Sequence, residues 1–420
     1  MQTLTSTMWE PFGLVGNPFF QRDLRAGDPA YPIDLFVGRK KERERIKRRL
    51  GTDSTTRSIV EGDPGVGKTS FVNRLKADLA EDGFVTYDQP VRIDSRSTRS
   101  AFIADVLRTL LRMRLGVGLT NDKAIWTRTA RMLEGAEVIG GSVSAMGFGA
   151  GISRAFVAPQ APPDSLYEHL GAALEEMTAE LGRPVVIHVN NLEALSLEDA
   201  DAASTLILDL RDYLLLEGAH WIFVGSTGIE ASVFRRHTQV GGIFPQSLKL
   251  MPLPAAELKQ LLIRRYEHLA LTGHTLTPPI EPDEAARLYA LYQGDLRNFL
   301  RLLTEAAEVL LGVPGIRPMT ELEVRRFAAL EYQEKLRDRL GQDDFEQLQR
   351  IVAAHGADEV RVADAVKATR LSQPTVSRLF QRLEAKNAIG PTRAVGKNRY
   401  YRPAGDVLVA FGADPGPLLS

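Results

Sequence analysis

Residues 57–83 read "RSIVEGDPGVGKTSFVNRLKADLAEDG", and this stretch decides the fold class. A short apolar segment runs into a glycine-rich turn, after which Phe71, Leu75 and Leu79 recur at helical spacing. The turn fits the pattern G-x-x-x-x-G-K-[ST], which has structural meaning only between a strand and a helix. The stretch therefore predicts a β-strand, a phosphate-binding loop and an amphipathic helix in that order.

The chemistry of this loop suits a nucleoside triphosphate. Its glycines let successive backbone N–H groups point at phosphate oxygens, and the positive N-terminal end of the following helix adds to the attraction. Lys68 is expected at the β- and γ-phosphates, and the Thr69 hydroxyl is expected to bind Mg²⁺. The alternative is a glycine-rich turn without a ligand. We expect ATP or ADP with Mg²⁺ as cofactor, contacted by Gly62, Asp63, Pro64, Gly65, Val66, Gly67, Lys68, Thr69 and Ser70.

Bulk composition limits the remaining options. A chain of 420 residues is expected to form two or three domains. The net charge of -1 gives no overall attraction to nucleic acid, so any basic surface must be local. The absence of cysteine excludes disulfides, thiolate metal sites and cysteine nucleophiles. No basic leader and no apolar run of about 20 residues is present, so we expect a cytoplasmic protein without membrane contact.

Four further strands are expected, near residues 83–90, 184–190, 220–227 and 247–253, with helical segments between them. This alternation predicts an α/β fold, a P-loop NTPase parallel sheet. The third of these strands ends in Ser226 and Thr227, whose small hydroxyls are suited to sensing a γ-phosphate.

The strand "VVIHVN" ends in two amides, Asn190 and Asn191, which we expect beside the phosphate loop. Acids normally stand there, one holding Mg²⁺ through water and one polarising the attacking water. An amide has no useful basicity, and a general base contributes about 10² to 10⁴ in rate. Glu193, two residues further on, is a candidate substitute base. The sequence therefore predicts an ATPase with a degenerate second acidic motif, in which Asn190 contacts the cofactor and hydrolysis is weak or partner-dependent.

With these motifs the chain resembles the AAA+ ATPases of the initiator clade, related to archaeal origin-recognition proteins. The resemblance rests on "FVGRKKERERI" (36–46), the phosphate loop, "FVGST" (223–227) and "YQGDLRNFLRLLTEA" (292–306). It implies that Gly38 and Arg39 lie near the adenine and that Arg297 reaches the phosphates from a helical lid.

Each assignment has an alternative. Arg39 stands in a charge run that would also suit a solvated helix face. Gly294 and Asp295 are also consistent with a simple turn and helix cap that leave Arg297 exposed. Arg235 and Arg236 occupy the place where such ATPases present an arginine to a neighbour's nucleotide, a role that requires a homo-oligomer.

The C-terminal sequence predicts three helices, near 345–356, 361–370 and 373–389, followed by a two-stranded wing at 390–403. This resembles a winged helix-turn-helix. Ten Lys and Arg stand against two acids between residues 361 and 402, which favours double-stranded DNA as partner over a protein-interaction winged helix. The residues expected to contact DNA are Gln373, Thr375, Ser377, Arg378, Gln381 and Arg382 on the third helix and Arg393, Lys397 and Arg399 in the wing.

The predicted organisation is an N-terminal arm (1–35), an ATPase core (36–250), a helical lid (251–335), a winged helix-turn-helix (342–405) and a tail (406–420). The core carries an insert at about 91–182, mostly helical, with a hairpin-like piece at 136–156. Three functions are consistent with this plan. The first is an AAA+ protein that binds DNA, with nucleotide as a conformational or oligomerisation switch. The others are a STAND-like signalling or transcription regulator, and an adaptor ATPase of a mobile element or defence system that delivers an effector protein.

Overall fold

The structure is a computed structural model that describes residues 8–93, 97–134, 163–190, 192, 200–311, 317–395 and 398–412. Asn191, Glu193, Lys397 and the hairpin-like segment 136–156 lie outside the described residues, as does the side chain of Arg393.

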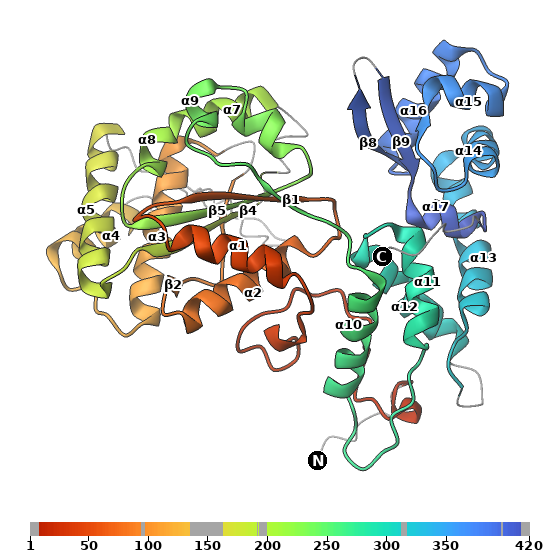
Figure 1. The fold of residues 1–420 in the computed structure, drawn as a ribbon, viewed down its shortest axis with the longest axis horizontal. Coiled ribbons are helices and arrows are strands. Elements are labelled where there is room, and N and C mark those ends of the chain that lie inside the picture. Colours follow the sequence, from red (N-terminus) through yellow and green to blue (C-terminus); the bar gives the residue numbers. More distant parts are fainter. Residues whose placement is uncertain are drawn as a thin grey trace, which may run out of the picture.

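A parallel sheet forms the centre of the first half of the chain (Figure 1). Its strands are β1 (Arg57–Gly62), β2 (Val85–Thr86), β3 (Val91–Arg92), β4 (Val185–Asn190), β5 (Ala219–Gly225) and β6 (Leu248–Leu250). The order is β2–β4–β5–β1–β6, with β3 also paired to β4, and all pairs are parallel. The predicted α/β class is confirmed.

One strand differs from the prediction. Within the stretch 83–90, where one strand is expected, only Val85–Thr86 (β2) is a strand, and β3 follows the bends at Asp88 and Gln89. Pro90 lacks an N–H group and therefore cannot donate to a strand ladder. The chain turns there before β3 pairs with β4 further along.

Helices cover both faces of the sheet. They are α1 (Lys40–Leu50), α2 (Lys68–Glu81), α3 (Arg99–Gly116), α4 (Ala124–Glu134), α5 (Pro163–Leu181), α7 (Ala200–Asp209), α8 (Arg211–Leu214), the π-helical turn η3 (Glu230–Phe234) and α9 (Thr238–Gly241). Because side chains alternate along a strand, β4 sends Val186 to a core shared with α1 and α2, and Ile187 to a core shared with α3 and α5. Over its described parts the insert is mostly helical (α3, α4 and α5), with β3 at its start.

The second half of the chain is mostly helical and lies beside the sheet (Figure 1). Its elements are α10 (Ala255–His268), α11 (Pro282–Tyr292), α12 (Leu296–Leu310), α13 (Glu321–Leu340), α14 (Gln342–His355), β7 (Val360–Arg361), α15 (Val362–Thr369), α16 (Gln373–Ala385), β8 (Ile389–Val395), β9 (Asn398–Pro403) and α17 (Gly405–Ala410). The last three strands form an antiparallel sheet in the order β7–β9–β8. The three helices and the hairpin expected at 345–403 are present. Among the described helices, none combines the length and apolarity needed to cross a bilayer.

The N-terminal arm contains two short turns, η1 (Glu10–Phe12) and η2 (Ile33–Leu35), and its first part packs on the helical half. The Trp9 and Phe19 rings meet edge to face at 5.8 Å, and Phe19 meets Tyr266 of α10 at 6.3 Å. One continuous apolar core joins this arm to α10–α13 and to the C-terminal helices. The molecule therefore has two bodies, the sheet with its own two cores and the helical half with the first part of the arm. The second part of the arm packs between α2 and the end of α10 in a small separate cluster.

Candidate nucleotide site

The phosphate loop runs from Gly62, the last residue of β1, to Lys68, the first residue of α2. Gly65 has φ 77° and Gly67 has φ 91°, a left-handed backbone that favours glycine. A Cβ atom on Gly67 would meet no other atom within 4 Å, so this backbone faces open space. The loop thus has the curled backbone that a phosphate group needs, with α2 beginning directly after it.

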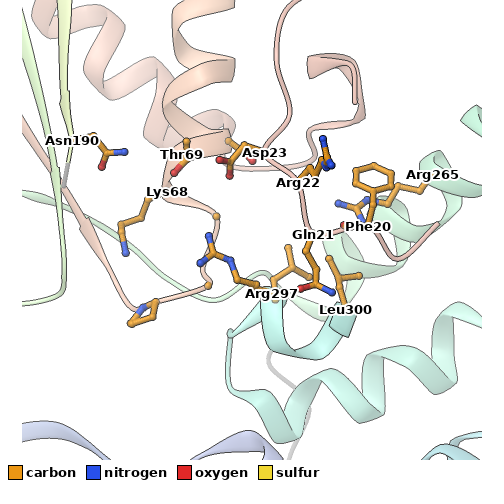
Figure 2. A pocket seen from close by; sticks show the side chains of 15 residues that line it. Phe20, Gln21, Arg22, Asp23, Lys68, Thr69, Asn190, Arg265, Arg297 and Leu300 are labelled. Atoms are coloured by element: carbon orange, nitrogen blue, oxygen red, sulfur yellow. Dashed lines mark hydrogen bonds between the residues drawn. The ribbon is translucent and has the colours of Figure 1, made fainter. Parts of the chain in front are cut away.

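A pocket of about 230 Å³ lies over this loop (Figure 2). Of the predicted cofactor residues, those that line it are Pro64, Gly65, Gly67, Lys68, Thr69, Ser70, Asn190 and Arg297. Prediction from sequence missed the others, which are Phe20, Gln21, Arg22, Asp23, Arg265, Leu296 and Leu300. Residues 20–23 follow an aromatic segment of the arm that is interrupted by Gly and Pro. This pattern does not indicate which residues of the arm belong to a binding site.

Cations face each other across the pocket. Lys68 Nζ donates to the carbonyl oxygens of Gly62 and Asp63 at 2.8 and 3.2 Å. The side chain of Arg297 extends from the first turn of α12 towards the loop (Figure 2). The Asp295 carboxylate caps α12 by accepting from the Asn298 N–H at 3.0 Å. The predicted turn and cap are therefore present, and Arg297 lines the pocket as well.

Asn190 reaches the pocket from the end of β4, although β5 lies between β4 and β1. Two residues earlier, His188 is buried on the same face of the strand, and this burial holds its pKa well below the usual range. A neutral imidazole and an amide therefore stand at this strand end. The pocket receives no negative charge from the described part of this strand end.

Gly38 and Arg39 lie behind the loop and are not among the residues that line the pocket. Arg39 is 6% exposed and donates to the carbonyl oxygen of Val66 at 2.9 Å. Burial lowers the pKa of its guanidinium. A side chain at Gly38 would collide with the carboxylate of Glu257 on α10. In this structure Arg39 supports the loop backbone, so it is not part of a solvated helix face.

The polar end of β5 contacts the loop from the other direction. Thr227 donates to Asp63 Oδ1 at 2.7 Å, and the Gly228 N–H donates to Glu61 Oε2 at 3.1 Å. Ser226 is not among the residues that line the pocket. The contact with the phosphate loop is therefore made by Thr227, in the turn that follows β5.

Arg235 and Arg236 lie away from the pocket and are held within the chain. Arg235 donates to Glu230 Oε1 at 2.9 Å and to the Gly241 carbonyl at 2.7 Å. Arg236 forms an ion pair with Asp201. To reach the nucleotide of a neighbouring subunit, as predicted, both side chains would have to leave these contacts within the chain.

The third C-terminal helix, α16, shows the predicted division of faces. Val376, Leu379, Phe380 and Leu383 are buried. The exposed members of the predicted DNA-contacting set are Gln373, Thr375, Arg378, Gln381, Arg382 and, on β9, Arg399, while Ser377 is half-buried. Arg382 is committed to Asp344 of α14, to which it donates at 2.6 and 2.9 Å.

Comparison with known proteins agrees with this architecture. Residues 35–223 match the family model described as the AAA ATPase domain. The Walker-type ATPase paby2304 of Pyrococcus abyssi superposes with a TM-score of 0.53 at 16% identity, covering 94% of this chain and 99% of that one. The ORC2 protein of Aeropyrum pernix, solved as ADPNP–ADP complexes, gives a TM-score of 0.50 at 14% identity over 94% and 96% of the two chains. No curated protein matches the sequence. Residues 35–223 are therefore similar to the AAA ATPase domain, and the whole chain shares its fold with these two proteins.

Proposed function

We propose that this chain binds ATP with Mg²⁺ as a conformational switch and binds double-stranded DNA through its C-terminal winged helix. One observation carries the proposal. The pocket is lined by the phosphate loop of the sheet body and by Arg297 of the helical body. A ligand that contacts both bodies binds more tightly when they are close together than when they are apart. Its binding therefore favours the closed arrangement of the two bodies.

Several features support a nucleoside triphosphate as this ligand. The loop, the N-terminal end of α2, Lys68 and Arg297 supply positive charge and donors for phosphate oxygens. The Thr69 hydroxyl and the Asn190 carbonyl oxygen are suited to holding Mg²⁺ and its bound water. The Aeropyrum pernix ORC2 structure, with the same fold, is described as ADPNP–ADP complexes.

We infer that hydrolysis is weak or depends on a partner. Asn190 supplies no charge to the metal shell, and an amide at Asn191 would supply no base. An arginine from a neighbouring subunit, Arg235 or Arg236, is the transition-state cation that an oligomer would add.

DNA binding is supported by the exposed polar and basic face of α16. Arg378 is exposed there, and Arg399 on β9 is exposed on the hairpin. Helix residues of this kind read base edges in the major groove, while a basic wing contacts phosphates. The shared apolar core ties α16 to the lid helices, so lid closure on nucleotide would move the DNA-binding face with it.

The test uses the full chain and a fluorescent duplex of random sequence, titrated without nucleotide, with ATP and with ADP. We expect DNA affinity to differ at least threefold between the ATP and ADP states. Affinity should also fall steeply between 50 and 200 mM salt, because phosphate contacts release counterions. A DNA affinity that changes neither with the nucleotide nor with the salt concentration would overturn the proposal.

A STAND-like regulator is the second candidate, and the intramolecular contacts of Arg235 and Arg236 favour it. Arginines already bonded within one chain suit a monomeric switch better than a ring. Gel filtration with and without ATP separates the two. Nucleotide-dependent oligomers that disappear in Arg236→Ala would support the oligomeric ATPase, and a monomer in every state would support the regulator.

A further inference from the structure

The arm crosses the nucleotide pocket between two fixed points. The first is Arg265 of α10, which donates to the carbonyl oxygens of Pro18 at 3.2 Å and Phe20 at 2.8 Å. Its guanidinium carbon lies 3.9 Å from the centroid of the Phe20 ring, and the side chain is 4% exposed. A buried guanidinium with these partners holds the arm firmly against α10.

The second fixed point is the beginning of α2. The Leu24 N–H donates to Ser70 Oγ at 3.4 Å, and Asn73 Nδ2 donates to the Leu24 carbonyl at 2.9 Å. The Leu24 side chain is buried in a small apolar cluster with Phe20. Residues 21–23 therefore form a short strap across the pocket, and all three line it.

Asp23 is chemically distinct from the rest of the pocket. Among the described residues that line it, Asp23 is the sole carboxylate, whereas Lys68, Arg22 and Arg297 are cationic. Within the described part of the chain, no donor bonds the Asp23 carboxylate. A partly exposed carboxylate facing a phosphate site is unfavourable unless the ligand itself offers a donor.

The position of Asp23 selects which part of a nucleotide it meets. Lys68 and Asn190 lie on one side of Thr69 in the close-up view, and Asp23 lies on the other (Figure 2). The first side is where the proposed nucleotide would place its β- and γ-phosphates and Mg²⁺. The strap is anchored at Ser70, the residue after Thr69. In a nucleotide bound with its terminal phosphates at Lys68, Asp23 would therefore lie nearer the α-phosphate and the sugar. Phosphate oxygens only accept hydrogen bonds, whereas ribose hydroxyls donate them to carboxylates.

We propose that the Asp23 carboxylate accepts hydrogen bonds from the ribose hydroxyls of the bound nucleotide, so that the strap selects ribonucleotides over deoxyribonucleotides. This inference rests on the proposed nucleotide binding. Because the strap connects α10 with α2, the same contact links the sugar to both bodies.

The test measures affinity of the full chain for ATP, 2′-deoxyATP and 3′-deoxyATP by calorimetry in the presence of MgCl₂. A charge-assisted hydrogen bond corresponds to about a 10- to 100-fold change in affinity. We therefore expect ATP to bind at least tenfold more tightly than one or both deoxy analogues. In Asp23→Asn this ratio should fall to within about threefold, mainly through weaker ATP binding. Glu10→Gln is the matched control, since Glu10 is an exposed acid in the same arm outside the pocket, and it should keep the ratio.

The outcomes separate this inference from the proposed function. Absence of ATP binding by the unaltered chain would overturn the function. Equal affinity of the unaltered chain for ATP and both deoxy analogues would leave the function in place and overturn the ribose contact. If Asp23→Asn weakens all three nucleotides equally and changes the Mg²⁺ concentration needed for binding, Asp23 acts on the metal and the ribose assignment is wrong.

Discussion

The two sides of the nucleotide pocket are built in different ways. The phosphate side comes from one continuous segment, residues 62–70, in which a glycine-rich backbone precedes a helix. The opposite side combines the strap with α10 and α12, and its Arg265–Phe20 contact joins residues 245 positions apart. The first side needs only local structure to bind phosphate. The second side exists only when the helical body is folded. Under the proposed function, it is the side through which nucleotide binding would affect the rest of the molecule.

Breaking the phosphate side should have the largest effect. Lys68→Ala removes the ammonium group expected at the β- and γ-phosphates, and we expect ATP affinity measured by calorimetry to fall about 100-fold. Lys40→Ala, an exposed lysine at the start of α1, is the control and should bind ATP normally. An affinity for Lys68→Ala within threefold of the unaltered chain would mean that the loop is not the phosphate site.

Placing acids on the phosphate side should produce a gain, in the rate of ATP hydrolysis, where the previous change produces a loss. The double change Asn190→Asp with Asn191→Glu supplies a metal-shell charge and a base. Single-turnover hydrolysis should rise by about 10- to 100-fold, towards the contribution of a general base. Asn190→Asp alone should give a smaller rise. Unchanged hydrolysis in the double variant would show that these amides are not at the catalytic positions.

The opposite side of the pocket, formed by the strap, α10 and α12, includes the lid and is called the lid side. Changing it should affect ATP affinity less than Lys68→Ala does, and should affect the coupling between nucleotide and DNA binding more. Arg297→Ala removes one cation from the pocket, and ATP affinity should fall about tenfold. The difference in DNA affinity between the ATP and ADP states should disappear. Arg301→Ala is the matched control on the same helix, because Arg301 pairs with Glu305 and is not among the residues that line the pocket. Equal behaviour of the two variants would argue against a role of Arg297 in closure.

The smallest effects are expected at the distant end of the helical body, where two arginines of α16 differ in their partners. Arg382→Ala breaks the paired bonds to Asp344 and should lower the free energy of unfolding by about 0.5–1 kcal/mol, since the Arg382 side chain is half-exposed while Asp344 is largely buried. Arg378→Ala should leave thermal unfolding unchanged and reduce the slope of log affinity for DNA against log salt by about 1. If instead Arg378→Ala lowered stability and Arg382→Ala reduced the salt slope, Arg378 would have the structural role and Arg382 would contact DNA.

Sequence predicted the phosphate side because its residues are contiguous and their spacing has a fixed geometric meaning. The apolar face of α16 was also predicted, since helical periodicity decides which side chains are buried. The lid side was predicted only at Arg297. The strap was missed because its anchors, Arg265 and Ser70, are distant in sequence and no local pattern joins them. The support of the loop by Arg39 was missed for a similar reason, since a charge run does not reveal which member is buried.

The shared core of the arm and the helical body also has a consequence for biosynthesis. Asn17 donates to the hydroxyl of Thr304 on α12 at 3.2 Å, across 287 residues of chain. At about 5–20 residues per second, a ribosome needs about 15–60 s to make the second partner after the first. Until the helical body is complete, Trp9, Phe12 and Phe19 lack most of the core that covers them in the folded chain. We therefore expect the sheet body to fold first, and the nucleotide pocket to be completed only when the last third of the chain returns to the first.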